Sequence, residues 1–491
     1  MGELYEKLRQ YRDSDYYGFH MPGHKRNTGL MENDLPYGLD ITEIEGFDDL
    51  HHAEGILKEA QERAAVVYHA DETCFLVNGS TVGLLSAVMG SVSQGGKVLV
   101  ARNCHRCVYH AIEMQEFYPV YLYPDLGPEG IAGEIDPGTV QKKLQENPEI
   151  QAVVIVSPTY DGVVSDVKAI ADIAHEQGIP LIVDEAHGAH FGFHPYFPKN
   201  ANEQGADLVI HSLHKTMPAL TQTALLHLNG KFAEKQRVRH YLDMLQSSSP
   251  SYLLMAGIDE CLELVKKNGK KLFYDYINRL NVLRSALKEM KWLHLLETPH
   301  YDRSKILIST KGCKKGAKET YKILLNDYHL QMEMVSDQSF LAMTSVADTE
   351  EGLERLRRAL LQIDAEIDGE AKKCAGSADA DETKKTESIK NIEKIRAEKQ
   401  DTDAPELIFT SGQMQRIRWE QRKKIKCLAW KECTGAVSAE YAYLYPPGIP
   451  LLVPGERVTK EIIERLQESE KSGNAVHGTA KPGFLEVWSN G

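Results

Sequence analysis

The fold is decided by two apolar runs that each lead into an ionisable residue. The first is Leu181-Ile182-Val183-Asp184-Glu185-Ala186-His187-Gly188, and the second is Ala206-Asp207-Leu208-Val209-Ile210-His211-Ser212-Leu213-His214-Lys215. Short runs rich in Val, Ile and Leu predict buried strands. The gap between the runs has the length of a helical connection, which favours parallel strands whose ends meet at one edge. Asp184 and Lys215 are therefore predicted to face a common site.

The surrounding sequence repeats this alternation of strands and helices between about residues 61 and 230. It favours parallel βαβ units with strands covered on both faces. The expected fold class is therefore α/β with a mostly parallel sheet. The strand-like runs are Thr73–Val77, Lys97–Ala101, Val120–Tyr123, Ala152–Ser157, Leu181–Asp184, Leu208–His211 and Thr223–Leu228.

The rest of the chain divides where its composition changes. A helical stretch from about 251 to 291 is followed by strand-like Lys305–Thr310 and Gln331–Val335 and by helix-like Glu350–Ile363. A charged segment with few large apolar groups comes next, and it favours a linker or a solvated helix. The expected units are an N-terminal irregular arm (1–60), a large domain (61–291), a small α/β domain (292–366), the charged linker (367–403) and a C-terminal domain (404–491).

Composition restricts the partners of the protein. The 491 residues carry 57 basic and 71 acidic side chains, a net charge of −14, which argues against nucleic acid or an anionic membrane as the main partner. No apolar stretch is long enough to span a bilayer, and the first residues lack a signal-peptide pattern. Eight cysteines form no disulfide framework. The expectation is a cytoplasmic enzyme with a small-molecule substrate.

Lys215 and Asp184 match the needs of pyridoxal 5'-phosphate (PLP), which takes an amine, an acid, a surface for the ring and a phosphate cradle. Lys215 can form the Schiff base, and Asp184 can keep the pyridine nitrogen protonated. Ala186 is small enough for a ring to lie against it. His105 follows the run Lys97–Ala101 at the same sheet edge and can stack on the opposite ring face.

The phosphate cradle is expected where Asn78-Gly79-Ser80-Thr81 follows a strand and opens a helix. Backbone N–H groups and the hydroxyls of Ser80 and Thr81 can bind a dianion there. Ser212 and His214 lie close enough to Lys215 in the sequence to add contacts. The sequence therefore offers all four parts of a PLP site.

Each part also has a plainer interpretation. Asp184 can cap a helix, His105 can simply begin one, and the turn before Thr81 is also an ordinary helix start. An isolated Ser-x-His-Lys sequence is commonly a surface loop. The position of Lys215 at the end of a β-run, with Asp184 upstream, favours the PLP site over these interpretations.

Metal binding is the weaker explanation of the histidines and cysteines. Cys104-x-x-Cys107 has no second pair to complete a zinc site. His187, His190 and His194 lie on a glycine-containing turn without a matching motif such as HExxH. His187 and His190 can instead carry protons or fill the core, and no metal is expected.

Eight short motifs occur together in order, and with them the chain resembles the Orn/Lys/Arg decarboxylase family, in particular its shorter bacterial arginine decarboxylase-like members. The match covers nearly the whole chain, although the charged segment 367–403 is a departure from the pattern. The motifs are Phe19-His20-Met21-Pro22-Gly23-His24-Lys25, Asp48-Asp49-Leu50-His51, Asn78-Gly79-Ser80-Thr81, Arg102-Asn103-Cys104-His105, Ser157-Pro158-Thr159-Tyr160-Asp161-Gly162, Asp184-Glu185-Ala186-His187-Gly188, Ser212-Leu213-His214-Lys215 and Tyr445-Pro446-Pro447-Gly448-Ile449-Pro450.

The resemblance implies an aspartate-aminotransferase-like fold, PLP fold type I, with smaller α/β C-terminal domains. It implies Lys215 as the Schiff-base lysine, Asp184 on the pyridine nitrogen and His105 on the ring. A homodimer or larger homo-oligomer with sites at the subunit interface is also implied. The residues implied around the phosphate are Ser80, Thr81, Ser212 and His214.

Decarboxylation is favoured over transamination because no arginine occurs in 216–224 or in 340–345, where a clamp for the substrate carboxylate would be expected. An unclamped carboxylate in an apolar setting is lost more easily as CO₂. Lys215 or His187 is the candidate that protonates Cα. Arginine is the expected substrate and polyamine biosynthesis the expected context, with lysine or ornithine as alternatives. An aminotransferase, an aldolase or a non-catalytic PLP-fold protein stays open.

A cationic substrate side chain needs an acid in the site. The sequence offers acidic candidates only through their closeness to the motifs. These candidates are Glu45, Asp48, Asp49 and Glu440.

Overall fold

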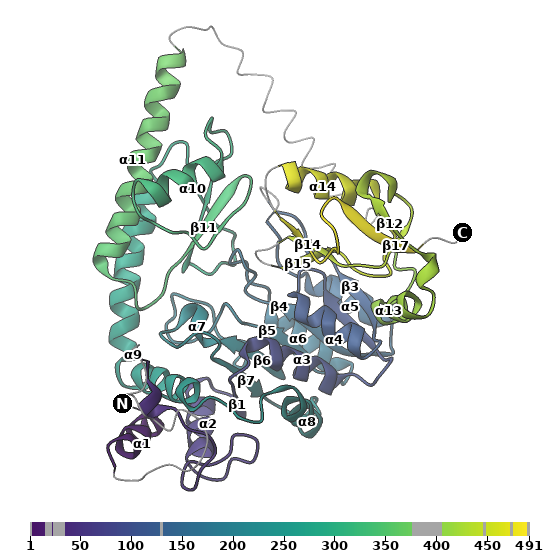
Figure 1. The fold of residues 1–491 in the computed structure, drawn as a ribbon. Coiled ribbons are helices and arrows are strands. Elements are labelled where there is room, and N and C mark those ends of the chain that lie inside the picture. The colour runs from purple at the N-terminus through teal and green to yellow at the C-terminus, as the bar shows by residue number, and fades with distance from the viewer. Residues whose placement is uncertain are drawn as a thin grey trace.

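The computed structural model describes residues 2–14, 22, 35–127, 131–375, 405–444, 448–471 and 475–488 (Figure 1). The motif at 19–25, apart from Pro22, and residues 445–447 of the last motif lie outside the described residues. Most of the expected linker lies outside them as well. Within the described ranges, no helix is both long and apolar enough to cross a membrane.

A seven-stranded sheet forms the centre of the molecule, in the order β1-β7-β6-β5-β4-β2-β3. Strands β3, β2, β4, β5 and β6 pair in parallel, whereas β7 runs antiparallel to both β1 and β6. The α/β class with a mostly parallel sheet is thus confirmed. The strands are β1 Glu72–Leu76, β2 Lys97–Ala101, β3 Tyr118–Leu122, β4 Ile150–Val156, β5 Leu181–Asp184, β6 Leu208–Ser212 and β7 Ala224–Leu228.

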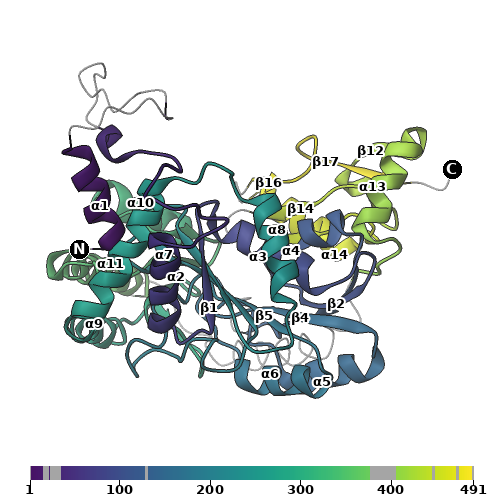
Figure 2. The same ribbon diagram turned by 90° about the horizontal axis from the view of Figure 1, so that it is seen from below.

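Helices cover both faces of this sheet, which explains why its inner strands are mostly apolar and almost entirely buried. Helices α3, α4 and α8 pack together on one face, and α5 and α6 pack against each other on the other (Figure 2). The helices are α2 Ile56–Val67, α3 Gly79–Ser91, α4 Arg106–Met114, α5 Pro137–Glu146, α6 Val167–Glu176, α7 Leu213–Thr216 and α8 Lys235–Leu245.

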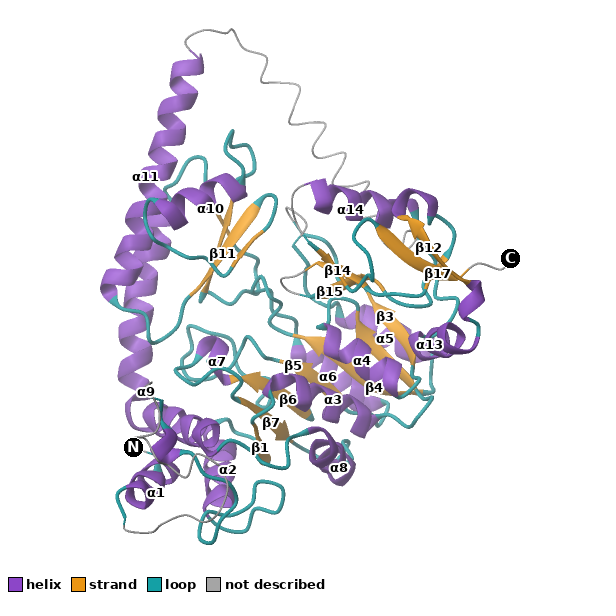
Figure 3. Cartoon of the chain, viewed as in Figure 1, coloured by secondary structure: helices purple, strands orange, loops and turns teal. Residues whose placement is uncertain are grey.

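A second layer is built around the 36-residue helix α9, Tyr252–Leu287. Helix α11, Glu350–Ala375, runs beside α9 along one side of the molecule (Figures 1 and 3). A four-stranded sheet in the order β10-β11-β9-β8 lies next to this pair. Its elements are β8 His294–Leu296, β9 Lys305–Ser309, α10 Ala317–Asn326, β10 Met334–Val335 and β11 Ser339–Met343.

One segment is more helical than its composition indicates, and the start of a second follows the helical alternative expected for it. Residues 1–60 are expected to be irregular, but Glu3–Arg12 forms helix α1, which buries Leu4 and Leu8 and packs on α9. Helix α11 also continues to Ala375, into the first part of the expected linker. Tertiary packing on α9 stabilises α1, a contribution that a short amphipathic sequence does not reveal. The expected domain boundaries stay a prediction.

The C-terminal residues form two three-stranded sheets, β12-β17-β13 and β15-β14-β16. Their own apolar core contains Trp430, Leu452, Leu466 and Leu485. The elements are α13 Ser411–Glu420, β12 Ile425–Ala429, β13 Val437–Ser438, β14 Ala442–Leu444, β15 Ile449–Leu452, α14 Lys460–Lys471, β16 Val476–His477 and β17 Phe484–Trp488. Short 3-10 turns occur at η2 Tyr37–Leu39, η4 Arg422–Lys424 and η5 Trp430–Glu432.

Candidate active site

The candidate site lies at the carboxyl ends of the parallel strands. Asp184 is the last residue of β5, and Lys215 lies in α7 directly after β6. These two strands pair in parallel, with Asp184 opposite Ile210. His105 caps α4, just beyond β2. Ligands commonly bind at this edge of open α/β sheets, because strand ends and helix starts converge there.

Lys215 and Asp184 form the ionisable centre of the site. Burial lowers the pKa of Lys215, and Asp184 partly opposes this effect. Burial likewise raises the pKa of Asp184, an effect that the charge of Lys215 reduces. The Asp184 carboxylate accepts the backbone N–H of Ala186 at 3.1 Å, and no described side chain donates a hydrogen bond to it. A buried carboxylate in this situation suits a cationic ligand.

His105 and Ala186 supply surfaces rather than charges. Burial, with Lys215 and Arg106 adding to it, lowers the pKa of His105 to about 4, so its imidazole is neutral at pH 7. Its Nδ1 accepts the backbone N–H of Cys107 at 3.3 Å, which fixes the ring at the start of α4. Ala186 is buried and small. A neutral aromatic ring and a methyl group are suitable neighbours for a flat heterocycle.

The expected phosphate residues come from two segments that meet. The Ser212 hydroxyl donates to the Ser80 hydroxyl at 2.8 Å, which joins the end of β6 to the first turn of α3. Gly79 has a φ of +75°, a conformation that lets α3 begin directly after β1. Thr81 is exposed on the same turn, and His214 Nδ1 lies 3.0 Å from the Thr223 carbonyl oxygen. The start of α3 therefore offers N–H groups and hydroxyls to an anion.

His187 and Lys305 form a part of the site that the sequence does not reveal completely. His187 Nε2 lies 3.1 Å from Lys215 Nζ, and its Nδ1 lies 2.9 Å from Lys305 Nζ. Lys305 begins β9 and is fully buried. A lysine at the head of a predicted strand gives no sign of burial, so only the packing of the two sheets identifies it.

Two acids lie close to these lysines. The Tyr160 hydroxyl donates to Glu333 Oε1 at 2.8 Å, and the Tyr160 ring packs edge-on against His187, with centroids 5.1 Å apart. The charge of Glu333 opposes the lowering of the pKa at both Lys215 and Lys305, which also places this charge near the site. Asp161 faces Lys305 as well.

The acids considered from the sequence have other partners. Asp48 accepts the backbone N–H groups of Glu54, Gly55 and Leu57 at the start of α2. Asp49 accepts the backbone N–H of His51, and Glu440 accepts those of Ala480 and Glu486. The structure thus gives Asp48, Asp49 and Glu440 structural roles. Glu45 lies on an exposed turn.

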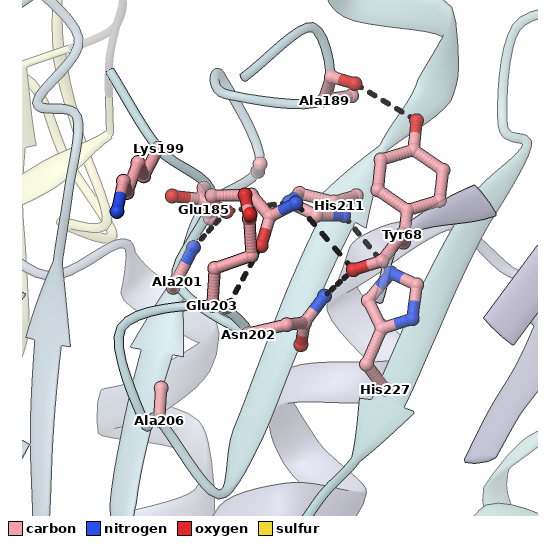
Figure 4. Close-up of polar contacts among 12 residues, drawn as sticks. Tyr68, Glu185, Ala189, Lys199, Ala201, Asn202, Glu203, Ala206, His211 and His227 are labelled. Carbon is pink, nitrogen blue, oxygen red and sulfur yellow. Dashed lines mark hydrogen bonds and ion pairs between the residues drawn. The ribbon is translucent and has the colours of Figure 1, made fainter. Parts of the chain in front are cut away.

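A buried polar network supports the strands behind the site (Figure 4). Glu185 Oε2 lies 2.6 Å from His211 Nε2 and accepts the Ala201 backbone N–H at 3.0 Å. His211 Nδ1 lies 2.9 Å from His227 Nε2, which links β6 to β7. The Tyr68 hydroxyl donates to the Ala189 carbonyl oxygen at 2.8 Å. Satisfied buried networks of this kind rigidify their surroundings, here the loop that follows Asp184.

Two of the histidines considered as metal ligands, His190 and His194, have other partners in the structure. Within the described residues, no group of three or more His, Cys, Asp or Glu side chains is placed to hold a metal ion. His190 Nε2 lies 3.0 Å from Asp302 Oδ1, and His194 Nδ1 accepts the Tyr196 backbone N–H at 3.1 Å. Cys104 and Cys107 are buried free thiols.

The residues present fit PLP. Asp184 is a buried acid with no side-chain donor among the described residues, Lys215 is a largely buried amine, and Ser80 and Ser212 meet at a helix start. When bound, the ring nitrogen would face Asp184, the aldehyde carbon would face Lys215, and the phosphate would lie at α3. These assignments stay predictions for each residue.

Known structures have the same architecture. The lysine decarboxylase LdcF from Francisella novicida superposes with a TM-score of 0.81 and 22% identity, covering 100% of this chain and 81% of that one. The constitutive lysine decarboxylase of E. coli gives 0.80 and 20%, covering 100% and 82%. The fold is therefore that of the PLP enzymes of fold type I, as expected.

The family follows from the sequence match along almost the whole chain. Residues 3–411 match the Orn/Lys/Arg decarboxylase major domain, and residues 410–485 match the C-terminal domain of the same family. This chain belongs to the Orn/Lys/Arg decarboxylase family.

Several bacterial relatives match over most of their own length. An arginine decarboxylase of Bacillus subtilis (strain 168) is 29% identical, over 97% of this chain and 95% of that protein. The uncharacterized protein YaaO of the same organism is 32% identical, over 97% and 96%. An arginine decarboxylase of Halalkalibacterium halodurans is 30% identical, over 94% and 91%. The resemblance to the arginine decarboxylase-like members is thereby confirmed.

Proposed function

We propose that this protein is a PLP-dependent decarboxylase that converts arginine to agmatine and CO₂. The observation that carries the proposal is the pair of Asp184, buried at the end of β5, and Lys215, half-buried in α7 directly after β6; burial raises the pKa of Asp184 and lowers the pKa of Lys215. Family membership supports the decarboxylation of a basic amino acid, and the relatives named arginine decarboxylase favour arginine. Lysine and ornithine are the alternative substrates.

Each residue of the site has a defined part in this proposal. Bound PLP supplies an electron sink when the substrate loses its carboxylate. Lys215 attaches the cofactor, Asp184 keeps its ring nitrogen protonated, and His105 and Ala186 enclose the ring. His187, 3.1 Å from Lys215, is placed to move a proton to or from that amine. The phosphate contacts are assigned to Ser80, Thr81, Ser212 and His214.

A negative charge close to Lys215 supports a basic substrate. Glu333 carries a negative charge that acts to raise the pKa of Lys215, and this charge suits the cationic end of a basic amino acid. We assign Glu333 to substrate recognition, in place of the acids considered from the sequence.

The wider setting belongs to the same proposal. Cysteines that are free in the described part of the chain suit a reducing cytoplasm. Polyamine biosynthesis follows from the proposed product. A homodimer or larger homo-oligomer is the assembly that the family resemblance implies.

Release of labelled CO₂ tests the reaction directly. PLP-loaded protein is incubated separately with carboxyl-labelled arginine, lysine and ornithine, and the rate of label release is measured for each. The proposal predicts release with the highest kcat/KM for arginine. Preference for lysine or ornithine would change the substrate assignment but retain the reaction.

Mapping of the cofactor separates the remaining alternatives. Borohydride treatment of the PLP-loaded protein, followed by peptide mass spectrometry, should locate the cofactor on Lys215. Attachment without CO₂ release from any of the three substrates would favour another PLP reaction, such as transamination or aldol cleavage. No attachment at Lys215 would favour a non-catalytic protein with this fold.

A further inference from the structure

Gln222 connects the loop that follows Lys215 to the turn that opens α3. Its side-chain Nε2 donates to the Val77 carbonyl oxygen at 2.7 Å, and Val77 directly follows β1. The backbone carbonyl of Gln222 also runs past Gly79, where an added Cβ would lie 3.9 Å from its oxygen. The side chain and the backbone of one residue therefore both lie against the segment to which the phosphate contacts are assigned.

The backbone of Gln222 has a conformation that favours glycine. Its φ is +82°, in the left-handed region that residues with a side chain rarely adopt. Strained backbone positions of this kind persist where the surrounding structure holds them, and they cluster at functional sites. A glycine would satisfy the backbone alone. The hydrogen bond to Val77 gives a physical reason for a glutamine side chain at this position.

The next residue, Thr223, fixes this loop to the short helix that carries Lys215. The Thr223 carbonyl oxygen accepts the backbone N–H of Leu213 at 3.1 Å, and His214 Nδ1 lies 3.0 Å from the same oxygen. Thr223 is fully buried. Gln222 is thus attached to α7 on one side and to the turn between β1 and α3 on the other.

Other polar groups of the turn are held by a different segment. The Val77 N–H donates to Gln246 Oε1 at 2.9 Å, and Asn78 Oδ1 accepts the Ser247 backbone N–H at 3.1 Å. Gln246 and Ser247 directly follow α8. These two contacts fix the turn to the end of α8, whereas the contact with Gln222 fixes it to the segment of Lys215.

The shape of PLP makes the spacing of the two segments important. Its aldehyde and its phosphate-bearing arm are attached to neighbouring ring carbons, so the amine and the phosphate cradle need a fixed separation. Two hydrogen bonds span the segments, from Ser212 to Ser80 at 2.8 Å and from Gln222 to Val77 at 2.7 Å. Ser212 and Ser80 are assigned to the phosphate itself. Gln222 lies behind them, where a supporting contact orients the groups that bind.

We propose that Gln222 is a positioning residue that sets the phosphate cradle at α3 relative to Lys215. Its amide holds the Val77 carbonyl group, and its positive φ brings its own carbonyl beside Gly79. The residue acts through the turn and not by touching the cofactor. The inference rests on the proposed function in that it takes the start of α3 as the phosphate site for PLP.

Comparison of PLP with pyridoxal, which lacks the phosphate group, tests this role without catalysis. The cofactor-free, full-length protein is titrated with each compound, and the change in absorbance gives each Kd. Gln222→Met keeps a long side chain but has no donor, and Gln222→Gly removes the donor and accepts the positive φ. His329→Gly is the matched control, because His329 is exposed and has a φ of +53° in the segment after α10.

The expected result is a loss of affinity that depends on the phosphate group. Both Gln222 variants should bind PLP about tenfold more weakly, the effect of losing one hydrogen bond, and should bind pyridoxal as the wild type does. His329→Gly should bind both compounds like the wild type. A merely structural role of Gln222 would weaken the binding of both compounds alike.

Three results would overturn the inference. The first is unchanged PLP affinity in Gln222 variants that circular dichroism shows to be folded, and the second is an equal loss for PLP and pyridoxal. The third is a wild type that binds PLP no more tightly than pyridoxal. If Gln222→Met fails to fold, Gln222→Gly decides, since glycine adopts this backbone conformation freely.

The proposed reaction is tested separately, because neither Kd depends on CO₂ release. A protein with the expected binding pattern but no CO₂ release would remove the proposed reaction and keep the role of Gln222. An active protein whose Gln222 variants bind PLP like the wild type would keep the reaction and remove that role.

Discussion

Arg102 and Glu456 form a buried ion pair, with Nη2 of Arg102 3.2 Å from Oε2 of Glu456. Arg102 follows β2 and lies three residues before His105, whereas Glu456 belongs to the C-terminal domain. Arg102 also donates to the Pro450 carbonyl oxygen at 2.6 Å, and Glu456 accepts the Val453 backbone N–H at 2.8 Å. The pair therefore fixes the C-terminal domain beside the loop that carries His105.

Replacing Arg102 with Met should destabilise the protein by about 3–5 kcal/mol, because Glu456 would stay buried without its cation. The double variant Arg102→Met with Glu456→Gln should be more stable than the single one. Urea unfolding followed by tryptophan fluorescence measures both, since Trp430 lies in the C-terminal core. Arg416→Met, which breaks the exposed pair with Glu116, is the control and should change little. Equal stability of Arg102→Met and the control would contradict the prediction.

Replacing Lys215 with Ala should abolish cofactor attachment and reduce CO₂ release by on the order of 10³-fold or more, because the other amine of the site, Lys305, lies on the far side of His187. Borohydride mapping and label release measure the two effects. Lys168→Ala, which removes an exposed lysine of α6, should behave like the wild type. Activity retained by Lys215→Ala would eliminate the assignment of this residue.

His105 should make the protein sensitive to mild acid. Its pKa is lowered to about 4 in the folded state, mainly by burial, whereas a histidine in the unfolded chain has a pKa of about 6.5. Between these two pH values His105 binds a proton in the unfolded state but not in the folded state, so the free energy of unfolding decreases as the pH falls from about 6.5 to about 4. Below about pH 4 both states are protonated at His105, and this residue causes no further loss of stability. At higher pH both states are neutral and the effect disappears.

The variant His105→Asn removes this titration and can still cap α4. Its free energy of unfolding should fall less than that of the wild type when the pH is lowered from about 7 to about 4.5, within the window set by the two pKa values. Urea unfolding at both pH values gives the comparison. His52→Asn, at a largely exposed histidine, should follow the wild type. Parallel losses in the wild type and His105→Asn would refute the assignment.

Glu333→Gln should weaken the binding of a basic substrate. The amide keeps a hydrogen-bond acceptor for Tyr160 but removes the negative charge near Lys215. The KM for arginine should rise about tenfold, the size of one charge-assisted hydrogen bond, with a smaller effect on kcat. Steady-state kinetics check this split. Glu319→Gln, on the exposed face of α10, is the control, and an identical KM in both variants would exclude Glu333 from substrate recognition.

The strands of the central sheet can be predicted from local sequence, because most of them are short runs rich in Val, Ile and Leu. The bounds of β2 and β5 agree with the predicted runs Lys97–Ala101 and Leu181–Asp184. The direction of β7 is less evident, since the expectation of parallel strands does not hold there. Only residues 213–223, with the short helix α7 among them, connect β6 to β7. This connection is shorter than the crossover of about a dozen residues or more that parallel neighbours need.

Site residues that directly follow predicted strands can be found from the sequence. Site residues that are brought in by the packing of distant segments cannot. The sequence brings Asp184, Lys215 and His105 to the same sheet edge, and the structure places all three there. Lys305 is distant in the sequence, and its burial depends on how β9 meets the loop after β5. The role of Asp48 depends in the same way on backbone N–H groups that only the folded chain presents.

The length of helix α9 fixes both the distance between the elements packed at its two ends and their rotation about the helix axis. It packs against α1 and α2 near one end and against α11 and β8 further along, and the chain continues from it to the strand that begins with Lys305. Inserting a single residue within it would rotate everything downstream by about 100° and advance it by about 1.5 Å. Seven inserted residues would nearly restore the rotation but lengthen the helix by about 10 Å. Insertions are therefore tolerated far more readily in the surface loops of this protein than within α9.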